Sequence, residues 1–345
     1  MFKLRPAQTA CMALVGVALF WGIAETSAKD SEEDLRALWR DPTDITSRDL
    51  MYGQGGKAHA PAGTLVFVEE DPDGNSPKFV VKDSQGVKWK VKLGAEVRPE
   101  TAATRLIWAA GFMTDEDYVV PTMPIQNLPK LKRGSEFQVE GGIKDARFER
   151  MERKKLGLWK WSSNPFKGTR EFDGLRVMMA IINNVDMKDS QNSIYEMTDG
   201  RQYVVSDLGA TFGGTGSHWP AVTPKGDAEI YNSSDFITKI TNKEVDFAAP
   251  AWPKMAGVVP VIPLPYTLLT QPVRLFGRTA APNITSQMWI GRDIPRDHVR
   301  WVGGILKQLS HQQIQDAFRA AYYPAADVES FTKAVEKRIA DLNQL

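Results

Sequence analysis

Two polar residues and a predicted β-hairpin near the middle of the chain have the types and spacing of a metal site. Asp199-Gly200 is a strong two-residue hairpin signal, and strand-like segments flank it on both sides. Counting outward from that turn sets Asn192 directly opposite Asp207. Directly opposed residues share one face of a sheet, with Cβ atoms about 4.5–5.5 Å apart. An amide oxygen and a carboxylate at that separation can hold a hard cation such as Mg²⁺.

A third polar residue precedes the hairpin in the chain. Asp186 lies six residues before Asn192, in the loop that enters the hairpin. A base at this position can face a phosphoryl group during its transfer. The alternative interpretation is structural, because Asp and Asn at strand ends are common turn and capping residues. The surrounding elements must decide between the two.

Three strands and a helix are predicted upstream of this region. The strand candidates are Thr64–Glu69, Lys78–Lys82 and Val87–Leu93, and the segments between them are rich in turn residues. Pro99 fits the first position of a helix and Gly111 the position just past its end. The sequence therefore predicts a helix over 100–110.

The predicted helix turns one carboxylate toward the sheet. Glu100 lies on one stripe with Ala103, Ile107 and Ala110, and a carboxylate on an apolar face is costly unless it is paired. Lys92, the last lysine of the third strand, is the nearest partner in sequence. A strand lysine paired with a helix glutamate positions the nucleotide phosphates in kinases. In the alternative interpretation, Glu100 is a first-turn residue stabilised by the helix dipole.

Two glycine-containing segments are candidates for a phosphate-binding loop. Gly53-Gln-Gly-Gly56 precedes the first clear strand, whereas Gly74-Asn-Ser-Pro-Lys78 lies between the first two strands. Neither motif is specific, and the order along the chain favours the second. Its candidate nucleotide-binding residues are Gly74, Ser76 and Lys78.

The remainder of the chain is predicted to be mainly helical. Residues 174–184 are apolar nearly all round, which is typical of a core helix that would anchor the loop with Asp186. Residues 158–166 are interpreted as a packed aromatic connector, or alternatively as a substrate edge. Residues 248–283 are rich in proline and form either an extended surface segment or a partner or lipid contact. Helical patterns follow from Asp297 onward.

The first 28 residues resemble a signal peptide. Lys3 and Arg5 precede an apolar stretch over 10–24, and Thr26-Ser27-Ala28 is an acceptable cleavage site. The apolar stretch is shorter than the roughly 20 residues of a spanning helix, so we expect an exported, periplasmic or secreted protein with no membrane span after cleavage. An uncleaved anchor is the alternative. The cleaved chain would have equal numbers of acidic and basic residues, which argues against a nucleic-acid partner.

The candidate residues follow one another in the order strand, helix, loop, hairpin and Asp-x-Gly. This order resembles the protein-kinase-like superfamily, and it is closest to the atypical branches: HipA-type bacterial kinases, phosphoinositide-kinase-like enzymes and secretory-pathway kinases. The chain also looks like a group of exported bacterial proteins with Trp-Lys-Val-Lys-Leu-Gly, Asn-Pro-Phe-x-Gly-Thr-Arg-Glu and Val-Ser-Asp-Leu-Gly segments. The likeness covers roughly residues 60–215.

The resemblance implies an α+β fold with two kinase-like lobes. Residues 29–60 would be an N-terminal extension, and residues 61–125 would form a small N-lobe with an antiparallel sheet and one helix. Residues 126–345 would form a mainly helical C-lobe that contains the catalytic hairpin, the proline-rich segment 248–283 and the helical tail.

The resemblance also implies ATP and Mg²⁺ as cofactors, with a role for each candidate residue. Lys92 would bind the α- and β-phosphates and Glu100 would hold Lys92. Asp186 would orient or deprotonate the acceptor, and Lys188 would neutralise the transferring charge. The metal ligands would be Asn192 and Asp207.

Two features depart from the superfamily pattern. The metal-binding Asn usually lies five residues after the catalytic Asp, and that position is Gln191 here. The His-Arg or Arg-His neighbours of the catalytic Asp are missing as well. The expected function is an exported phosphotransferase acting on an unknown protein, glycan or small-molecule acceptor. The alternatives are a pseudokinase that serves as a ligand-binding scaffold, and a structural envelope protein without catalysis.

Overall fold

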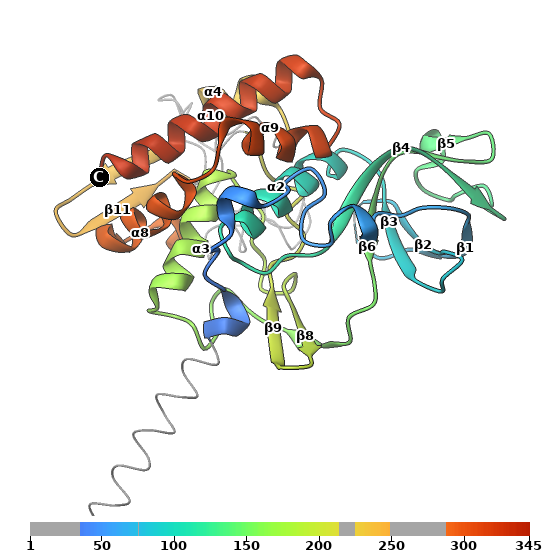
Figure 1. Ribbon diagram of the computed structural model, residues 1–345, viewed down its shortest axis with the longest axis horizontal. Coiled ribbons are helices and arrows are strands. Elements are labelled where there is room, and N and C mark those ends of the chain that lie inside the picture. The colour runs from blue at the N-terminus through green and yellow to red at the C-terminus, as the bar shows by residue number, and fades with distance from the viewer. Residues whose placement is uncertain (1–34, 75, 214–224, 249–287) are drawn as a thin grey trace, which may run out of the picture.

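The fold combines a closed sheet at one end of the molecule with helices at the other (Figure 1). The computed structural model describes residues 35–74, 76–213, 225–248 and 288–345. The predicted signal peptide lies outside the described residues, as does the proline-rich segment except for residue 248. Both interpretations therefore stay predictions.

Six strands form the main sheet, which surrounds its own hydrophobic core. They are β1 (Leu65–Asp71), β2 (Lys78–Lys82), β3 (Lys88–Lys92), β4 (Asp117–Gln126), β5 (Gln138–Val139) and β6 (Gly142–Arg150). The strand order is β3-β2-β1-β4-β6-β5, and β3 also pairs with β6, so five of the strands close into a barrel. All pairs are antiparallel except β1 and β4, which run parallel. Phe79, Trp89 and Phe148 are among the side chains that fill the interior.

The three predicted strands of this region are confirmed. β2 has the predicted bounds, and β1 and β3 differ from the prediction only at their ends. The sheet also includes β5 and β6, which lie beyond residue 125, so it extends further along the chain than the sequence indicated. β6 pairs with both β3 and β4, and such long-range pairings leave no local signal.

Helix α2 (Val97–Ala109) lies between the barrel and the remaining helices (Figure 1). It contacts β4 and β6 on one side and helix α9 on the other, and this explains why nearly all of its side chains are buried. It begins before the predicted start, so Pro99 is its third residue. The predicted end is confirmed, because Gly111 follows with a φ of 93°, a left-handed conformation that favours glycine.

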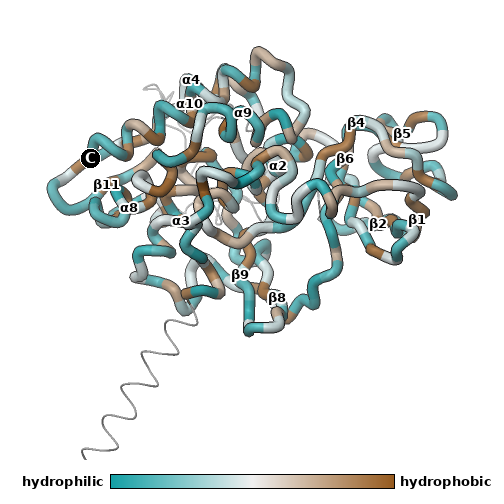
Figure 2. Tube along the Cα trace, viewed as in Figure 1, coloured by the Kyte–Doolittle hydropathy of each residue, from teal (hydrophilic) through white to brown (hydrophobic). Residues whose placement is uncertain are grey.

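The other helices whose bounds lie within the described residues share a second hydrophobic core. They are α3 (Arg170–Ile181), α4 (Ala228–Ser233), α8 (Arg296–Leu306), α9 (His311–Ala320) and α10 (Ala325–Asn343). The predicted core helix corresponds to α3, and α8 to α10 confirm the helical tail. Trp159, Trp161 and Phe166 are buried in this core, which confirms the packed connector. In Figure 2, hydrophobic and hydrophilic stretches alternate along α9 and α10, as expected for helices with one buried face.

Two small sheets and several short 3-10 turns complete the described part of the chain. One sheet consists of β7 (Lys155–Leu158), β8 (Ser193–Met197) and β9 (Gly200–Val204), and the other of β10 (Ile237–Ile240), β11 (Glu244–Phe247) and β12 (Ile294–Pro295). The 3-10 turns are η1 (Ile45–Ser47), η2 (Lys57–His59), η3 (Ser135–Phe137) and η4 (Met288–Gly291). Within the described ranges, none of the helices has both the length and the apolar character that crossing a membrane requires.

Gly111→Ala is expected to destabilise the protein by roughly 2–4 kcal/mol, because strain at positive φ adds to a steric clash. A Cβ atom at Gly111 would overlap the Arg40 carbonyl oxygen and lie 2.7 Å from Trp39 Nε1. Gly141→Ala is the matched control, because Gly141 has a φ of 72° and nothing lies within 4 Å of its added Cβ. Urea unfolding of both variants measures the difference. Equal losses of unfolding free energy in the two variants would contradict the role assigned to the steric clash at Gly111.

Candidate functional site

The β8–β9 hairpin is present, but its turn lies one residue earlier than predicted. Met197 pairs with Gly200, so Thr198 and Asp199 form the turn. Gly200 has a φ of 135°, which favours glycine, and it begins β9 instead of completing the turn. Moving the turn by one residue shifts every pairing across the hairpin by two.

The predicted position of Asn192 directly opposite Asp207 is therefore wrong. Ser193, the next residue after Asn192, pairs with Val204. The Asn192 side chain is buried, and its Oδ1 accepts a hydrogen bond of 3.2 Å from the Ser206 backbone N–H. Asn192 Nδ2 has no hydrogen-bond partner within the described part of the chain. In this structure Asn192 supports the segment before Asp207, and its role as a metal ligand stays a prediction.

Gln191 takes the position between the two acidic residues. Its Nε2 donates to Asp207 Oδ2 at 2.9 Å and to Asp186 Oδ2 at 3.3 Å. Its Oε1 accepts from the Lys188 N–H at 2.8 Å, which orients the amide. Gln191 was not among the predicted site residues. The signal that identifies it is its spacing, because it lies five residues after Asp186.

The predicted pair of Lys92 and Glu100 is present. Lys92 Nζ lies 2.9 Å from Glu100 Oε2 and 3.1 Å from Asp207 Oδ1. It also lies 2.8 Å from Oε2 of Glu96, a residue that the sequence analysis missed although it is four residues after Lys92. One ammonium group, whose side chain is only 9% exposed, thus contacts three carboxylates.

Burial and the neighbouring charges shift the pKa values in this cluster in opposite directions. Burial disfavours the charged form of Lys92, but Glu100 and Asp207 outweigh it and raise the pKa of the ammonium above its ordinary value. Burial raises the pKa of Glu100 in spite of Arg147 and Lys92 nearby. The pKa of Asp207 is lowered, because Lys92 outweighs the effect of burial. Lys92 and Asp207 are therefore held as a cation and an anion at neutral pH.

Arg147 on β6, the cross-strand neighbour of Lys92, holds the Oε1 atom of Glu100, while Lys92 binds Oε2. Its guanidinium lies 3.2 Å from Glu100, 2.9 Å from Asp117 and 2.9 Å from Glu149. Arg105 completes the set with a 3.2 Å pair to Asp117. The side chains of these residues are almost fully buried, so the barrel and α2 are joined by a charged layer that fixes the orientation of Glu100.

A cavity of about 250 Å³ opens beside Lys92. Lys78 is the cross-strand neighbour of Lys92 and also lines the cavity. The side chains around it are polar or charged: Lys78, Lys90, Lys92, Glu100, Asp115, Arg147, Glu149, Lys155, Ser190, Gln191, Ser193, Tyr195, Ser206 and Asp207. The arrangement suits a strongly polar ligand with negative charge next to the lysines.

The two glycine segments lie in different places. Ser76, in the segment between β1 and β2, donates from Oγ to Glu96 Oε2 at 2.8 Å, which places it next to the Lys92 cluster. The carbonyl of Gly74 accepts from Arg133 at 2.8 Å. A Cβ atom at Gly53, in the other segment, would lie 2.7 Å from the guanidinium of Arg105. Gly53 therefore permits a close approach to α2.

Asp186 and Lys188 form a half-exposed pair at the edge of the site. Lys188 Nζ lies 2.6 Å from Asp186 Oδ2, and the two side chains are 37% and 36% exposed. Asn184 Oδ1 accepts from the Asp186 N–H at 3.0 Å and shapes the loop after α3. Through Gln191, this pair is connected to Asp207.

The donor set is compatible with one divalent cation shared with a ligand. Asp186 and Asp207 direct carboxylate oxygens at the same Gln191 nitrogen, and a hard cation can replace such a donor between two anions. Mg²⁺ usually takes one or two protein carboxylates and completes its shell with phosphate oxygens and water. No group of three or more His, Cys, Asp or Glu side chains able to hold a metal occurs among the described residues.

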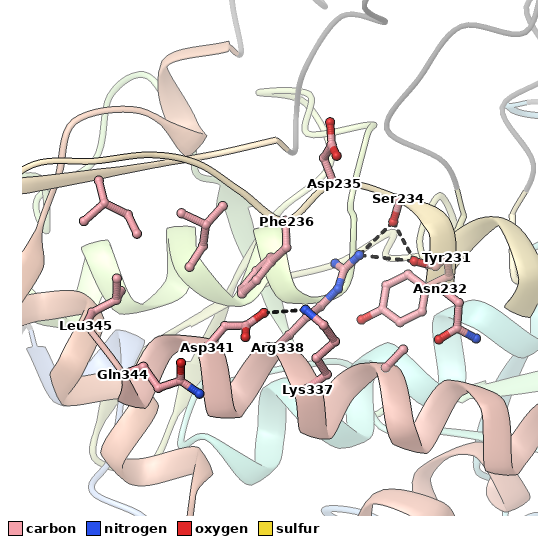
Figure 3. Close-up of a pocket in the computed structure, with 13 residues that line it drawn as sticks. Tyr231, Asn232, Ser234, Asp235, Phe236, Lys337, Arg338, Asp341, Gln344 and Leu345 are labelled. Atoms are coloured by element: carbon pink, nitrogen blue, oxygen red, sulfur yellow. Dashed lines mark hydrogen bonds and ion pairs between the residues drawn. The ribbon is translucent and has the colours of Figure 1, made fainter.

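A larger cavity, of about 550 Å³, lies between α4, β10 and α10 (Figure 3). Its buried cation is Arg338, which donates to the carbonyls of Ala180 at 3.1 Å and Ile181 at 2.9 Å. It also donates to Asn183 Oδ1 at 2.9 Å and Ser234 Oγ at 2.7 Å. Arg338 thus binds the last turn of α3 and the first residue of the loop that leads to Asp186.

Comparisons with known proteins give likenesses to solved structures alone. No family model matches the chain, and no curated protein matches it. The chain is similar to the crystal structure of a Helicobacter pylori proinflammatory kinase, CtkA, with a TM-score of 0.44 and 10% identity over 82% of this chain and 98% of that chain. A TM-score below 0.5 carries no argument for activity, so the function must be inferred from the geometry of the site.

Arg338→Met is expected to destabilise the protein by roughly 2–4 kcal/mol, because the buried carbonyls of α3 lose a charged donor. Lys337→Met is the matched control on the same helix, since Lys337 forms a pair with Asp341 and is 75% exposed. The control should change the free energy of unfolding by less than about 0.5 kcal/mol. Chemical unfolding measures both, and similar values for the two variants would refute the assigned role.

Glu149 is expected to stabilise the protein at neutral pH, and this contribution should be lost on acidification. Burial opposes its ionisation, but Lys90 and Arg147 lower its pKa from 4.5 to about 2. A carboxyl group whose pKa falls on folding stabilises the protein above its unfolded pKa, and this contribution is lost as the pH falls through its folded pKa. Glu149→Gln should therefore cost roughly 2–3 kcal/mol at pH 7 and progressively less between pH 4.5 and 2.

Urea unfolding of wild type and Glu149→Gln at pH 7, 4 and 3 tests this expectation. Glu152→Gln serves as the control, because the Glu152 side chain is 50% exposed. A difference between Glu149→Gln and wild type that widens on acidification would show that the direction of the pKa shift is wrong.

Proposed function

We propose that the protein is a phosphotransferase with a two-lobed, kinase-like architecture that uses a nucleoside triphosphate and Mg²⁺. The observation that supports this proposal is the convergence of Glu100 and Asp207 on the ammonium of Lys92, beside a polar cavity. In kinases, a strand lysine paired with a helix glutamate meets the Asp of the Asp-x-Gly segment, and together they position the phosphates and the metal.

Phosphate binding in this proposal depends on the lysines at the cavity. Lys92 contacts the phosphates while Arg147 holds Glu100 in place. Lys78 lies beside Lys92 on the neighbouring strand, and Lys155 lines the cavity from β7. The loop of Gly74 and Ser76 adjoins these residues and provides further contacts. When bound, Mg²⁺ supplies positive charge that neutralises the phosphates.

The acceptor side of the reaction is assigned to the loop after α3. Asp186 orients the acceptor hydroxyl or takes its proton, and Lys188 stabilises negative charge on the transferring group. The half-exposed position of Asp186 is consistent with a protein, a glycan or a small molecule as the acceptor. We place the reaction in an exported compartment on the basis of the signal-peptide-like first 28 residues.

A ligand-binding scaffold without transfer is the second candidate, and one observation favours it. Lys92 already contacts three carboxylates, and Gln191 bonds to both Asp186 and Asp207. A site with its polar groups satisfied in this way can hold a ligand or join the two parts of the molecule without chemistry.

Phosphate transfer should disappear when either acidic residue is neutralised. The full chain is incubated with γ-labelled ATP, Mg²⁺ and a mixture of protein, glycan and small-molecule acceptors, and incorporated label is measured. Asp207→Asn and Asp186→Asn are expected to lower the rate by at least roughly 100-fold, because they remove charge at the metal and the base. Asp199→Asn is the matched control, since Asp199 lies at the hairpin turn and is 67% exposed.

The outcomes separate the candidate functions. Label transfer that persists at the wild-type rate in Asp207→Asn and Asp186→Asn would refute the assigned roles. Thermal stabilisation by ATP without label transfer supports the scaffold, and a ligand present at about 100 times its Kd adds roughly 2.7 kcal/mol. If millimolar ATP gives neither label transfer nor thermal stabilisation, the result favours a structural envelope protein without catalysis.

A further inference from the structure

Glu96 is bound by the groups that usually hold a phosphate. Its Oε2 lies 2.8 Å from Lys92 Nζ and accepts a 2.8 Å hydrogen bond from Ser76 Oγ. Its Oε1 pairs with the ammonium of Lys225. Two cations and a hydroxyl group, from three separate segments of the chain, therefore converge on one small anion.

The position of Glu96 is not explained by helix capping. Glu96 is the N-cap residue of α2, but its side chain makes no capping hydrogen bond. Its stem packs against Gly209 of the Asp-Leu-Gly segment, where an added Cβ would lie 2.6 Å from Glu96 Cβ. The carboxylate is thus directed away from the helix backbone and toward the lysines.

Glu96 and Glu100 both contact Lys92, but they differ in exposure and in their other partners. Glu100 is 3% exposed and is also held by Arg147. Glu96 is 17% exposed and sits between Lys92, Lys225 and the loop of Ser76. Glu96 is therefore the carboxylate that an incoming anion can displace, whereas Glu100 keeps Lys92 in place.

We propose that Lys92, Lys225 and Ser76 form a phosphate-binding subsite. In the free protein, the carboxylate of Glu96 occupies this subsite. A phosphate group of the ligand competes with this internal anion and binds only after Glu96 withdraws. The identification of the ligand as a nucleotide rests on the proposed function, but the anion competition does not. Glu96 then acts as a built-in inhibitor that lowers the affinity of the site.

Removing the charge of Glu96 should tighten the binding of pyrophosphate. Isothermal titration calorimetry with inorganic pyrophosphate compares the full-length wild type with Glu96→Gln, which keeps the size of the side chain. We expect Glu96→Gln to bind at least roughly tenfold more tightly, because a like charge next to the ligand is lost. Glu100→Gln, on the same helix and the same lysine, should bind more weakly than wild type. Glu136→Gln, an exposed site on η3, should not change affinity.

The proposal also predicts that the pyrophosphate affinity gained by Glu96→Gln depends on Lys225. Glu96→Gln combined with Lys225→Ala should lose most of the gained affinity, because one of the two cations is absent. Equal or weaker pyrophosphate binding by Glu96→Gln, or no binding by any form, overturns the proposal. Label transfer from ATP is measured in parallel. Tighter pyrophosphate binding without transfer overturns the proposed function alone, and transfer without tighter binding overturns this inference alone.

Discussion

The ammonium of Lys92 is the contact on which the arrangement of the site depends. It lies on the last residue of β3 and meets carboxylates from the start of α2 and from the segment after β9. A buried charge is tolerated only where it is paired, and removing one partner leaves the others uncompensated. The barrel, α2 and the Asp-Leu-Gly segment are therefore held in one relative position by electrostatics, although they belong to two separate hydrophobic cores.

The charged layer around Arg147 contributes more to the orientation of Glu100 than to the stability of the fold. Arg147 contacts Glu100, Asp117 and Glu149, and all four side chains are nearly inaccessible to water. Replacing such a network by apolar side chains is often neutral or stabilising, so ion pairs of this kind are weak evidence for a role in stability. Their effect here is geometric, because Arg147 holds one oxygen of Glu100 and leaves the other to bind Lys92.

The sequence predicted the features that depend on local periodicity. Turn-rich connections delimited β2 and β3, helical spacing identified the tail helices, and the polar residue on an apolar stripe identified Glu100 as the partner of Lys92. The hairpin register was wrong because Gly200 can serve either as a turn residue or as the first residue of a strand. β6 and the contacts of Gln191 depend on pairings between distant segments, which no local pattern encodes.

The lining of the cavity indicates what kind of recognition the site can provide. Its side chains are polar or charged, and Tyr195 supplies the one aromatic ring among the described residues that line it. Binding pockets for drug-sized ligands are mostly apolar, and burial of apolar surface supplies much of their affinity. A nucleotide base would gain little affinity from apolar burial in this cavity, so the affinity must come from charged groups. In such a site an internal carboxylate such as Glu96 competes on the same terms as a ligand, and one charge is sufficient to alter occupancy.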